Sequence, residues 1–283
     1  MPLVPLPQLL IEPIVRGALL EDLGRAGDIT TDAIAASDSK MKTVMAARQA
    51  GVVAGVDLAA LAFTLIDPAV RFVALAPDGA TVAPGTPIAT IEGSARGVLT
   101  GERVALNFVC RLSGVASATA KLVAAVAGTK ARIVCTRKTT PMMRAIEKHA
   151  VRAGGGANHR FGLDDAALIK DNHVAIAGGV GEAIRRVRAH VGHLVKIEVE
   201  VDTLAQLEEA LTVGADAVLL DNMTLDDLRR GVAMIGGRAI SEASGRVDLE
   251  TAAAIAATGV DLISVGWITH SAPILDIGLD YAA

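Results

Sequence analysis

The second half of the chain alternates short apolar, β-branched runs with amphipathic stretches of helical period. One of the helical stretches has clear ends, because Thr203 and Gln206 form a capping-box pattern at its start and Gly214 can close it. The apolar runs predict strands at residues 131–135, 166–169, 195–199, 217–220, 239–241 and 262–265. This alternation predicts a parallel sheet that closes, or nearly closes, into a barrel.

A short internal repeat supports this organisation. The sequence GADAV at 214–218 recurs as GVDLI at 259–263, and each copy lies where a helical pattern gives way to a strand pattern. A second, weaker capping pattern pairs Thr224 with Asp227 and is closed at Gly236. We interpret the repeat as one helix-to-strand turn that is used twice.

The first half of the chain has a different pattern. A helical period over 9–23 is followed by β-like segments around 43–53 and 71–91, with turn sequences between them. A long helical pattern then runs from about 100 to 126, and we expect it to break near Gly114. This helix links two parts of different architecture.

Composition narrows the possible classes of protein. The 283 residues are 52% hydrophobic and 20% charged, which excludes extended disorder, and only 2% are aromatic, which argues against single-stranded nucleic-acid binding. The apolar run at 51–66 contains Asp57, and no basic region precedes the apolar N-terminal residues, so we expect no membrane span and no targeting segment. We expect Cys110 and Cys135 to be buried, reduced thiols of a cytoplasmic protein.

The candidate chemistry lies between residues 136 and 173. This stretch reads TRKTTPMMRAIEKHAVRAGGGANHRFGLDDAALIKDNH, and it is rich in basic residues although the formal net charge of the chain is -4. A local cationic basin in a mildly acidic protein favours a small, highly anionic ligand over a nucleic-acid surface. The basic side chains are Arg137, Lys138, Arg144, Lys148, His149, Arg152, His159, Arg160, Lys170 and His173.

Polar residues directly follow most of the strands predicted in the second half. Because the carboxyl ends of barrel strands converge on one mouth, these residues predict an active site there. Cations near strand ends can surround a carboxylate or phosphate, and the four in such places are Arg137, Lys138, Arg160 and Lys170. By contrast, Arg144, Lys148 and Arg152 repeat at helical spacing, and we interpret them as a solvated helix face.

Two carboxylates and two glycine-containing loops complete the predicted mouth. Glu200 and Asp221 end consecutive strands, so we expect neighbours that act as acid and base or hold Mg²⁺ beside a pyrophosphate. The surrounding cations keep both carboxylates ionised, which favours the metal role. Ser244-Gly245 and Gly266 follow the last two strands, where barrels commonly bind phosphate through backbone N–H groups.

These motifs resemble those of the quinolinate phosphoribosyltransferase family. The matching segments in the second half are TRKTTP at 136–141, GGGANHRFGLDDAALIKDNH at 154–173, EVEVD at 198–202, LLDN at 219–222, EASG at 242–245 and THS at 269–271. The matching segments in the first half are EDLG at 21–24, GDITT at 27–31, GVVAG at 51–55 and ERVALNFVCRLSG at 102–114. The similarity covers nearly the whole chain, in the order that the family has.

The resemblance implies an α/β fold with an N-terminal α/β sandwich domain at 1–113 and a C-terminal open (β/α) barrel at 114–269. The tail at 270–283 would pack back on the first domain. The implied reaction joins quinolinate to phosphoribosyl pyrophosphate with Mg²⁺, giving nicotinate mononucleotide, carbon dioxide and pyrophosphate for NAD biosynthesis. The family also implies a homodimer with shared active sites, or a higher oligomer, with no nucleic-acid or membrane partner.

The resemblance also implies roles for single residues. The side chains that would face the quinolinate carboxylates are Arg103, Arg137, His159 and Arg160, with Arg103 reaching into the neighbouring subunit's site. Lys138 and Lys170 would line the same anionic pocket, and Lys138 would also lie near the pyrophosphate. Glu200 and Asp221 would approach Mg²⁺ and the ribose hydroxyls. The residues that would cradle phosphate are Ser244, Gly245 and Gly266.

Two positions depart from the family pattern. The family usually has another glycine after EASG, whereas this chain has Arg246, and Trp267 replaces the small residue expected after Gly266. We interpret both as tolerated loop changes, with an altered substrate as the alternative.

Three rival functions remain to be weighed. A related group encoded with molybdate transport genes shares the fold but lacks the full NHR…IKDNH pattern that this chain has. Nicotinate phosphoribosylation without decarboxylation explains the arginine cluster less well than a doubly anionic acid does. A non-catalytic anion- or nucleic-acid-binding barrel is disfavoured by Glu200 and Asp221, because carboxylates hinder a pure polyanion binder.

Overall fold

The computed structural model describes residues 3–281 and divides into two compact units, each with its own sheet. Unit 1 comprises the residues up to 120 together with 139–155 and the residues from 268 onward, and unit 2 comprises 121–138 and 156–267. The long helix α4 (Ala95–Ala125) contains the border between the units as well as residue 113, where the sequence predicts a domain boundary.

Unit 1 is built on a four-stranded antiparallel sheet in the order β12-β1-β5-β3, beside a two-stranded ribbon of β2 and β4. The end of the chain is an edge strand of this sheet, because β12 pairs with β1 and places Ile277 opposite Ala47. The strands are β1 (Lys40–Ala47), β2 (Gly51–Val52), β3 (Arg71–Ala74), β4 (Thr81–Val82), β5 (Pro87–Ser94) and β12 (Ile277–Tyr281).

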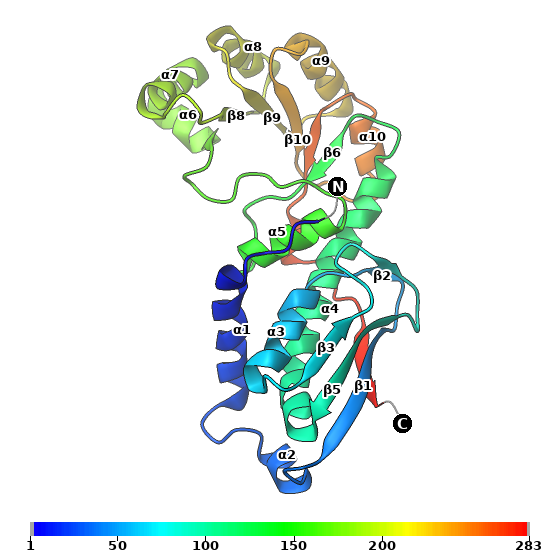
Figure 1. The fold of residues 1–283 in the computed structure, drawn as a ribbon. Coiled ribbons are helices and arrows are strands. Elements are labelled where there is room, and N and C mark those ends of the chain that lie inside the picture. Colours follow the sequence, from blue (N-terminus) through cyan, green and yellow to red (C-terminus); the bar gives the residue numbers. More distant parts are fainter. Residues whose placement is uncertain (1–2, 282–283) are drawn as a thin grey trace. The chain divides into compact units, whose positions relative to one another are not determined.

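Helices lie along one face of this sheet and form an α/β sandwich with it (Figure 1). They are α1 (Gln8–Leu23), α3 (Val56–Ile66) and α4, and unit 1 also contains α2 (Ile29–Ile34) and α5 (Arg144–Ala153). Met45, Phe63, Ile88 and Leu112 are fully buried, so the core of the unit is almost entirely aliphatic. By length and composition alone α4 could cross a membrane, but 56% of its most apolar window is buried, as in a core helix.

The predicted break in the long helix is wrong, because α4 continues through Gly114 without interruption. The glycine is there for close packing: a Cβ at this position would lie 2.1 Å from the carbonyl oxygen of Pro273. The same helix carries Cys110, which is only partly buried, whereas Cys135 is buried as expected.

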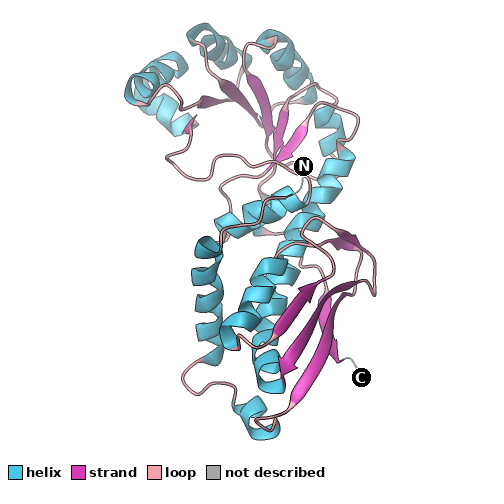
Figure 2. Cartoon of the chain, in the orientation of Figure 1, coloured by secondary structure: helices cyan, strands magenta, loops and turns pink. Residues whose placement is uncertain are grey.

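Unit 2 contains a six-stranded, all-parallel sheet in the order β6-β11-β10-β9-β8-β7 (Figure 2). Its two edge strands do not pair with each other, and Ala157 instead forms a bridge to Val134 of β6, so the barrel is open. The strands are β6 (Arg132–Val134), β7 (Ala167–Ile169), β8 (Ile197–Val201), β9 (Ala217–Asp221), β10 (Ile240–Ser244) and β11 (Leu262–Ser264). The predicted fold class is confirmed.

The helices of unit 2 pack on the outer face of the curved sheet (Figure 1). They are α6 (Asp171–Ala177), α7 (Val180–His190), α8 (Leu204–Val213), α9 (Leu225–Ile235) and α10 (Ala252–Ala256), followed by α11 (Trp267–His270) at the unit border. The predicted capping box is confirmed, because Thr203 Oγ1 accepts the Gln206 N–H and Gly214 adopts the left-handed conformation with φ +83°.

The internal repeat is one turn used twice, and its aspartate aligns neighbouring strands. Asp216 accepts a hydrogen bond from the backbone N–H of Ile197 at 3.0 Å and forms an ion pair with Lys196 at 2.6 Å. Asp261 likewise accepts the N–H of Ser241 at 2.9 Å and an ion pair from Lys130. Each aspartate directly precedes one strand and binds the amino end of the strand before it, β8 or β10, which helps to set the register of the neighbouring strands.

Strands β8 and β10 run further toward the mouth than the sequence predicts. In β8 the apolar Ile197, Val199 and Val201 are buried on one face, and Glu198 and Glu200 occupy the other. Polar residues were read as the end of the strand, but with a period of two they continue it and point toward the inside of the open barrel. The inner face therefore carries the chemistry.

We predict opposite effects for two Gly→Ala changes in helices. Gly114→Ala should lower the free energy of unfolding by about 1–3 kcal/mol, since the methyl group collides with the Pro273 carbonyl. Gly17→Ala is the matched control: it lies exposed in α1 with nothing within 4 Å, and should raise stability by about 0.5–1 kcal/mol. Urea unfolding measures both, and equal effects would contradict the packing argument.

Candidate active site

Polar side chains from three neighbouring strands share the inner face of the open barrel. Strand pairing places Glu200 of β8, Leu219 of β9 and Glu242 of β10 in one row. One row nearer the mouth, Asp221 at the end of β9 pairs with Ser244 at the end of β10. Because register partners in a parallel sheet point to the same side, these carboxylates and the hydroxyl face one space.

Lys170 meets Glu200 at the mouth. The lysine Nζ donates to Glu200 Oε2 at 3.1 Å, and its side chain stays 51% exposed while that of Glu200 is 14% exposed. Lys170 stands just before α6, where its backbone N–H donates to His173 Nδ1 at 3.0 Å. The last histidine of the IKDNH motif thus holds the lysine in place and does not add to the cationic pocket.

Arg137 lies close enough to Arg160 to influence its charge. Burial lowers the pKa of Arg160, and the positive charge of Arg137 lowers it further. The Arg160 Nη1 donates to the carbonyl of Ala166 at 2.9 Å, whereas its Nε is buried and makes no hydrogen bond within residues 3–281. Two adjacent guanidinium groups with an unsatisfied donor favour the binding of an anion.

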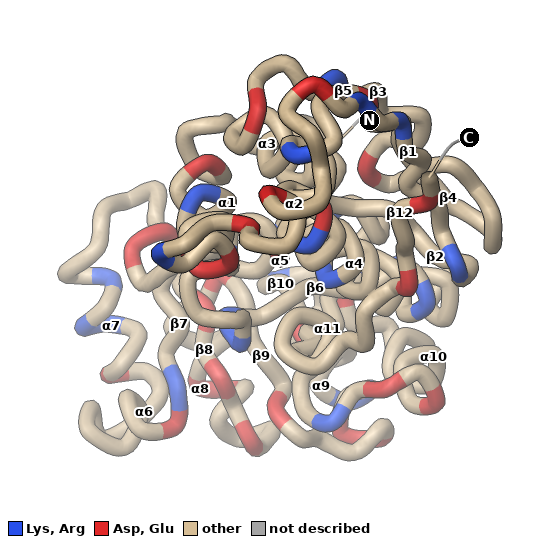
Figure 3. The backbone as a smooth tube through the Cα atoms, turned by 90° about the horizontal axis from the view of Figure 1, so that it is seen from below, with Lys and Arg blue, Asp and Glu red and all other residues tan. Residues whose placement is uncertain are grey.

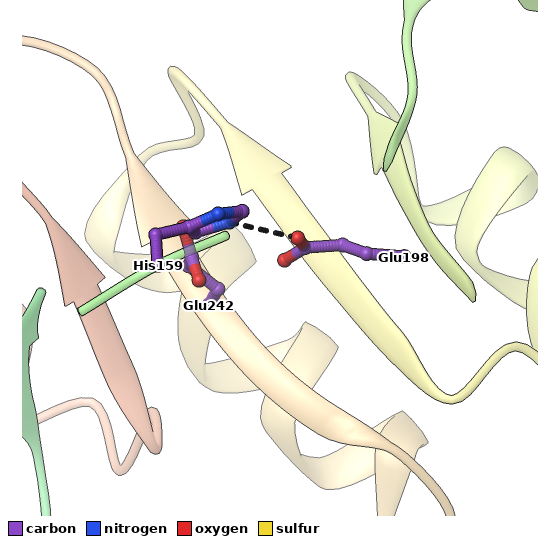
Figure 4. A group of neighbouring side chains, drawn as sticks. All are labelled: His159, Glu198 and Glu242. Carbon is purple, nitrogen blue, oxygen red and sulfur yellow. Dashed lines mark hydrogen bonds and ion pairs between the residues drawn. The ribbon is translucent and has the colours of Figure 1, made fainter. Parts of the chain in front are cut away.

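His159 lies between two glutamates on the inner face (Figure 4). Its Nε2 is 2.9 Å from Glu198 Oε2 and 3.6 Å from Glu242 Oε1. Its Nδ1 accepts the backbone N–H of Arg160 at 2.8 Å. Glu242 is 1% exposed, so this cluster is the most deeply buried group of ionisable residues at the mouth.

Burial raises the pKa of Glu242 to about 8, and the negative charge of Glu198 beside it acts in the same direction. Glu242 therefore keeps its proton at neutral pH. The spacing of His159, Glu198 and Glu242 also suits a metal ion, with ligand atoms within 4.8 Å of one another. However, Nδ1 of His159 accepts a hydrogen bond, so Nε2 holds the ring proton, and a protonated glutamate is a poor ligand.

Glu200 and Asp221 offer a better donor set for Mg²⁺. Both are carboxylates at the ends of adjacent strands on the inner face, and hard oxygen donors are what this ion prefers. Asp221 also accepts the Asn222 side-chain amide at 2.6 Å, which orients its carboxylate. These two residues therefore fit the metal role.

The loop after β10 has an unusual backbone conformation at Gly245 and Arg246. Gly245 has φ +106°, and a Cβ on it would lie 2.3 Å from Asn222 Oδ1, so no side chain fits there. Asn222 and Arg246 themselves have φ of +50° and +46°, which is unusual for residues other than glycine. Trp267 Nε1 donates to the Val247 carbonyl at 2.9 Å, so the loops after β10 and β11 are joined.

Part of the cationic basin belongs to unit 1. In α5, Glu147 and Lys148 are fully buried, so the interpretation of a solvated face is wrong for Lys148, while Arg152 is exposed as expected. Glu147 accepts hydrogen bonds from Arg111 at 2.9 Å and from the Thr140 hydroxyl at 2.8 Å. The helix is thus held by a buried ion pair, and its charges are structural.

The predicted site residues divide in the same way. Acidic and basic residues are mixed over the whole described backbone, so the basic stretch at 136–173 is a local concentration of positive charge (Figure 3). Unit 1 holds Arg103, exposed on α4, and unit 2 holds the others, which are Arg137, Lys138, His159, Arg160, Lys170, Glu200, Asp221, Ser244, Gly245 and Gly266. The sequence reasoning missed Glu198 as a site residue, although its place two residues before Glu200 on a strand was a usable signal.

An open α/β barrel with adjacent arginines, a lysine and carboxylates at its mouth defines an enzyme for small anionic substrates. Residues 28–113 and 115–280 match the sequence profiles of the quinolinate phosphoribosyl transferase N-terminal and C-terminal domains. The chain belongs to the quinolinate phosphoribosyltransferase family.

Named relatives match the chain over almost its full length. It is 47% identical over 271 residues to the nicotinate-nucleotide pyrophosphorylase (carboxylating) of Mycobacterium leprae, covering 94% of this chain and 95% of that one. The probable enzyme of the same name from Bacillus subtilis is 41% identical, with 95% and 93% covered. The crystal structure of NadC from Streptococcus pyogenes superposes with a TM-score of 0.94 at 41% identity, covering 99% of this chain and all of that one.

The buried Glu242 predicts a pH dependence of stability. The folded state holds this proton up to about pH 8, against an ordinary pKa of 4.5, so the stability it contributes is complete below about pH 4.5 and is lost as pH rises toward 8. Glu242→Gln removes the titration. Its stability relative to the wild type should therefore rise between pH 5 and pH 8, by at most about 1.4 kcal/mol per pH unit.

Urea unfolding at several pH values measures this difference. The exposed Glu208→Gln on α8 is the control, and its difference from the wild type should not change with pH. A Glu242→Gln difference that stays constant from pH 5 to pH 8 would show that Glu242 is ionised throughout.

Proposed function

We infer that this protein transfers the phosphoribosyl group of phosphoribosyl pyrophosphate to quinolinate with loss of carbon dioxide. The products are nicotinate mononucleotide and pyrophosphate, and the reaction belongs to NAD biosynthesis. The observation that carries this conclusion is that residues 28–113 and 115–280 match both domains of the family. The same chain also has a cluster of basic residues at the mouth of the barrel. The names of the relatives, carboxylating pyrophosphorylases and decarboxylating transferases, describe the same reaction in its two directions.

The charges of the substrates explain the residues at the mouth. Quinolinate carries two carboxylates on adjacent ring carbons, and we assign them to Arg137 and Arg160, with His159 beside them and Arg103 supplied from a second subunit. A guanidinium group binds a carboxylate through two parallel hydrogen bonds, which fixes the ring as well as its charge. A monoacid such as nicotinate would leave part of this arginine cluster without an anion.

The chemistry needs positioning and electrostatics more than a reactive side chain. The pyridine nitrogen attacks C1′ as pyrophosphate leaves, and Lys138 and Lys170 stabilise the negative charge that accumulates. The resulting pyridinium ring withdraws electrons from C2, so the bond to the C2 carboxylate breaks and carbon dioxide leaves. The carbon then takes up a proton, which completes nicotinate mononucleotide.

We propose that Glu200 and Asp221 hold Mg²⁺ and approach the ribose hydroxyls. When bound, the ion would neutralise the pyrophosphate that leaves. Ser244, Gly245 and Gly266 would bind phosphate through backbone N–H groups, for which the left-handed turn after β10 is suited. The Lys170–Glu200 ion pair places a cation beside the Glu200 carboxylate at the mouth.

We also propose a cytoplasmic homodimer, or a higher oligomer built from it. The thiol state of Cys110 and Cys135 supports a reducing compartment. The exposure of Arg103 supports a role toward a second subunit.

Product analysis tests the function directly. Purified protein with phosphoribosyl pyrophosphate and Mg²⁺ should convert quinolinate, and not nicotinate, to nicotinate mononucleotide with release of carbon dioxide. Conversion of nicotinate instead would identify the monoacid reaction. Folded protein that forms no product from either acid would make Arg246 and Trp267 the first positions to examine for a changed ligand.

The site assignment predicts large losses of activity. Arg137→Ala and Lys170→Ala should each lower turnover at least ~100-fold, because each removes a preorganised charge contact at the substrate. Steady-state kinetics on folded variants measures this, and near-wild-type turnover in both would contradict the assignment.

A mixing experiment tests the shared site. Arg103→Ala and Lys170→Ala proteins, each inactive alone, should regain part of the wild-type activity when mixed, since a mixed dimer contains one site with both residues intact. No recovery, with mixed dimers shown to form, would place Arg103 outside the neighbour's site.

A further inference from the structure

We propose that Glu198 and Glu242 are positioning residues for quinolinate binding, which hold His159 and, through it, the backbone of Arg160. The chain of contacts runs from the buried strands β8 and β10 to the loop that carries the arginine. The inference rests on the proposed function, because it takes Arg160 as part of the quinolinate site. It changes the role of His159 from a cation that meets the substrate to a neutral link between scaffold and arginine.

The state of the His159 ring follows from its hydrogen bonds. A backbone N–H can only donate, so the 2.8 Å contact from Arg160 N makes Nδ1 an acceptor without a proton. The neutral ring then carries its proton on Nε2 and donates it to Glu198 Oε2 at 2.9 Å. Both ring nitrogens are thus used in hydrogen bonds within the protein.

The two glutamates bracket the ring from separate strands (Figure 4). Glu198 extends from β8 and Glu242 from β10, with β9 between the two strands, where Glu198 pairs with Ala217 and Glu242 pairs with Leu219. Glu242 Oε1 lies 3.6 Å from Nε2 and makes no hydrogen bond to any residue that the structure describes. Glu242 therefore limits where the ring can move, while Glu198 supplies the directional hydrogen bond.

The contacts of His159 fix the position of Arg160. The Arg160 backbone N–H donates to His159 and its Nη1 donates to the Ala166 carbonyl, so the backbone and the guanidinium of Arg160 are each held at one point. Its buried Nε has no hydrogen-bond partner within residues 3–281 and remains available for an anion. Loss of the Glu198 hydrogen bond would free the imidazole, and with it the backbone of Arg160, which weakens quinolinate binding without touching the phosphoribosyl donor.

The test compares Glu198→Ala with Glu198→Gln. The alanine variant should raise KM for quinolinate by about 10-fold or more, with KM for phosphoribosyl pyrophosphate within about twofold of the wild type. The glutamine variant should restore KM for quinolinate to within about threefold, because its side-chain oxygen accepts the same Nε2–H. If the cluster instead held a metal ion or a charged imidazolium, glutamine would fail as alanine does.

Val199→Ala is the matched control. Val199 neighbours Glu198 on β8 but is fully buried on the opposite face, so its truncation should lower the melting temperature and leave KM for quinolinate unchanged. If KM for quinolinate rises as much in Val199→Ala as in Glu198→Ala, the rise comes from destabilisation of β8 in general. That result would overturn the proposal. An unchanged KM in folded Glu198→Ala would overturn it as well.

Nitrogen-15 NMR of the His159 ring tests the same proposal without catalysis. The wild-type protein should show an unprotonated Nδ1 and a protonated Nε2 near neutral pH, and Glu198→Gln should keep this state. A doubly protonated ring, or a proton on Nδ1, would refute the proposed link even in an inactive protein. Absence of product from quinolinate with the expected NMR state would instead overturn the proposed function and leave the hydrogen-bond chain standing.

Discussion

The guanidinium group of Arg160 is partly buried, and both its burial and the positive charge of Arg137 lower the pKa of Arg160. Two adjacent guanidinium groups favour the binding of an anion, so under the proposed function this pair would select a dianion over a monoacid. The surrounding scaffold must prevent the two groups from moving apart. The contacts of Arg160 with His159 and Ala166 serve this purpose, and the other polar groups at the mouth are arranged around this constraint.

The parallel sheet supplies the rigidity that these contacts need. On β8 the apolar positions anchor the strand against helices, while Glu198 and Glu200 share the other face and take different tasks. Glu198 is tied to His159 inside the barrel, whereas Glu200 lies nearer the mouth with Lys170. These two glutamates lie two residues apart on the same face of β8. Because Glu198 lies deeper in the barrel than Glu200, Glu198 serves as a hydrogen-bond acceptor for His159 and Glu200 is a candidate metal ligand.

Local signals in the sequence predicted much of this architecture, and long-range packing accounts for what was missed. Caps such as Thr203 with Gln206 depend on neighbours in the chain, so they could be read directly. The continuity of α4 at Gly114 depends on Pro273, and the burial of Lys148 depends on tertiary packing of α5, so neither leaves a local pattern. The contact of His159 with Glu198 joins residues 39 positions apart and required the fold.

Arg246 and Trp267 lie in two loops that a hydrogen bond connects, so we interpret the two departures from the family pattern as coupled. A phosphate cradle uses backbone N–H groups, so what matters is the path of the chain, and Arg246 adopts the left-handed conformation that a glycine would take, with φ +46°. Trp267 holds the next residue, Val247, through its indole N–H, which can offset the strain of that conformation. The loop therefore keeps the path that the proposed phosphate cradle needs, and the exposed guanidinium of Arg246 adds positive charge beside it.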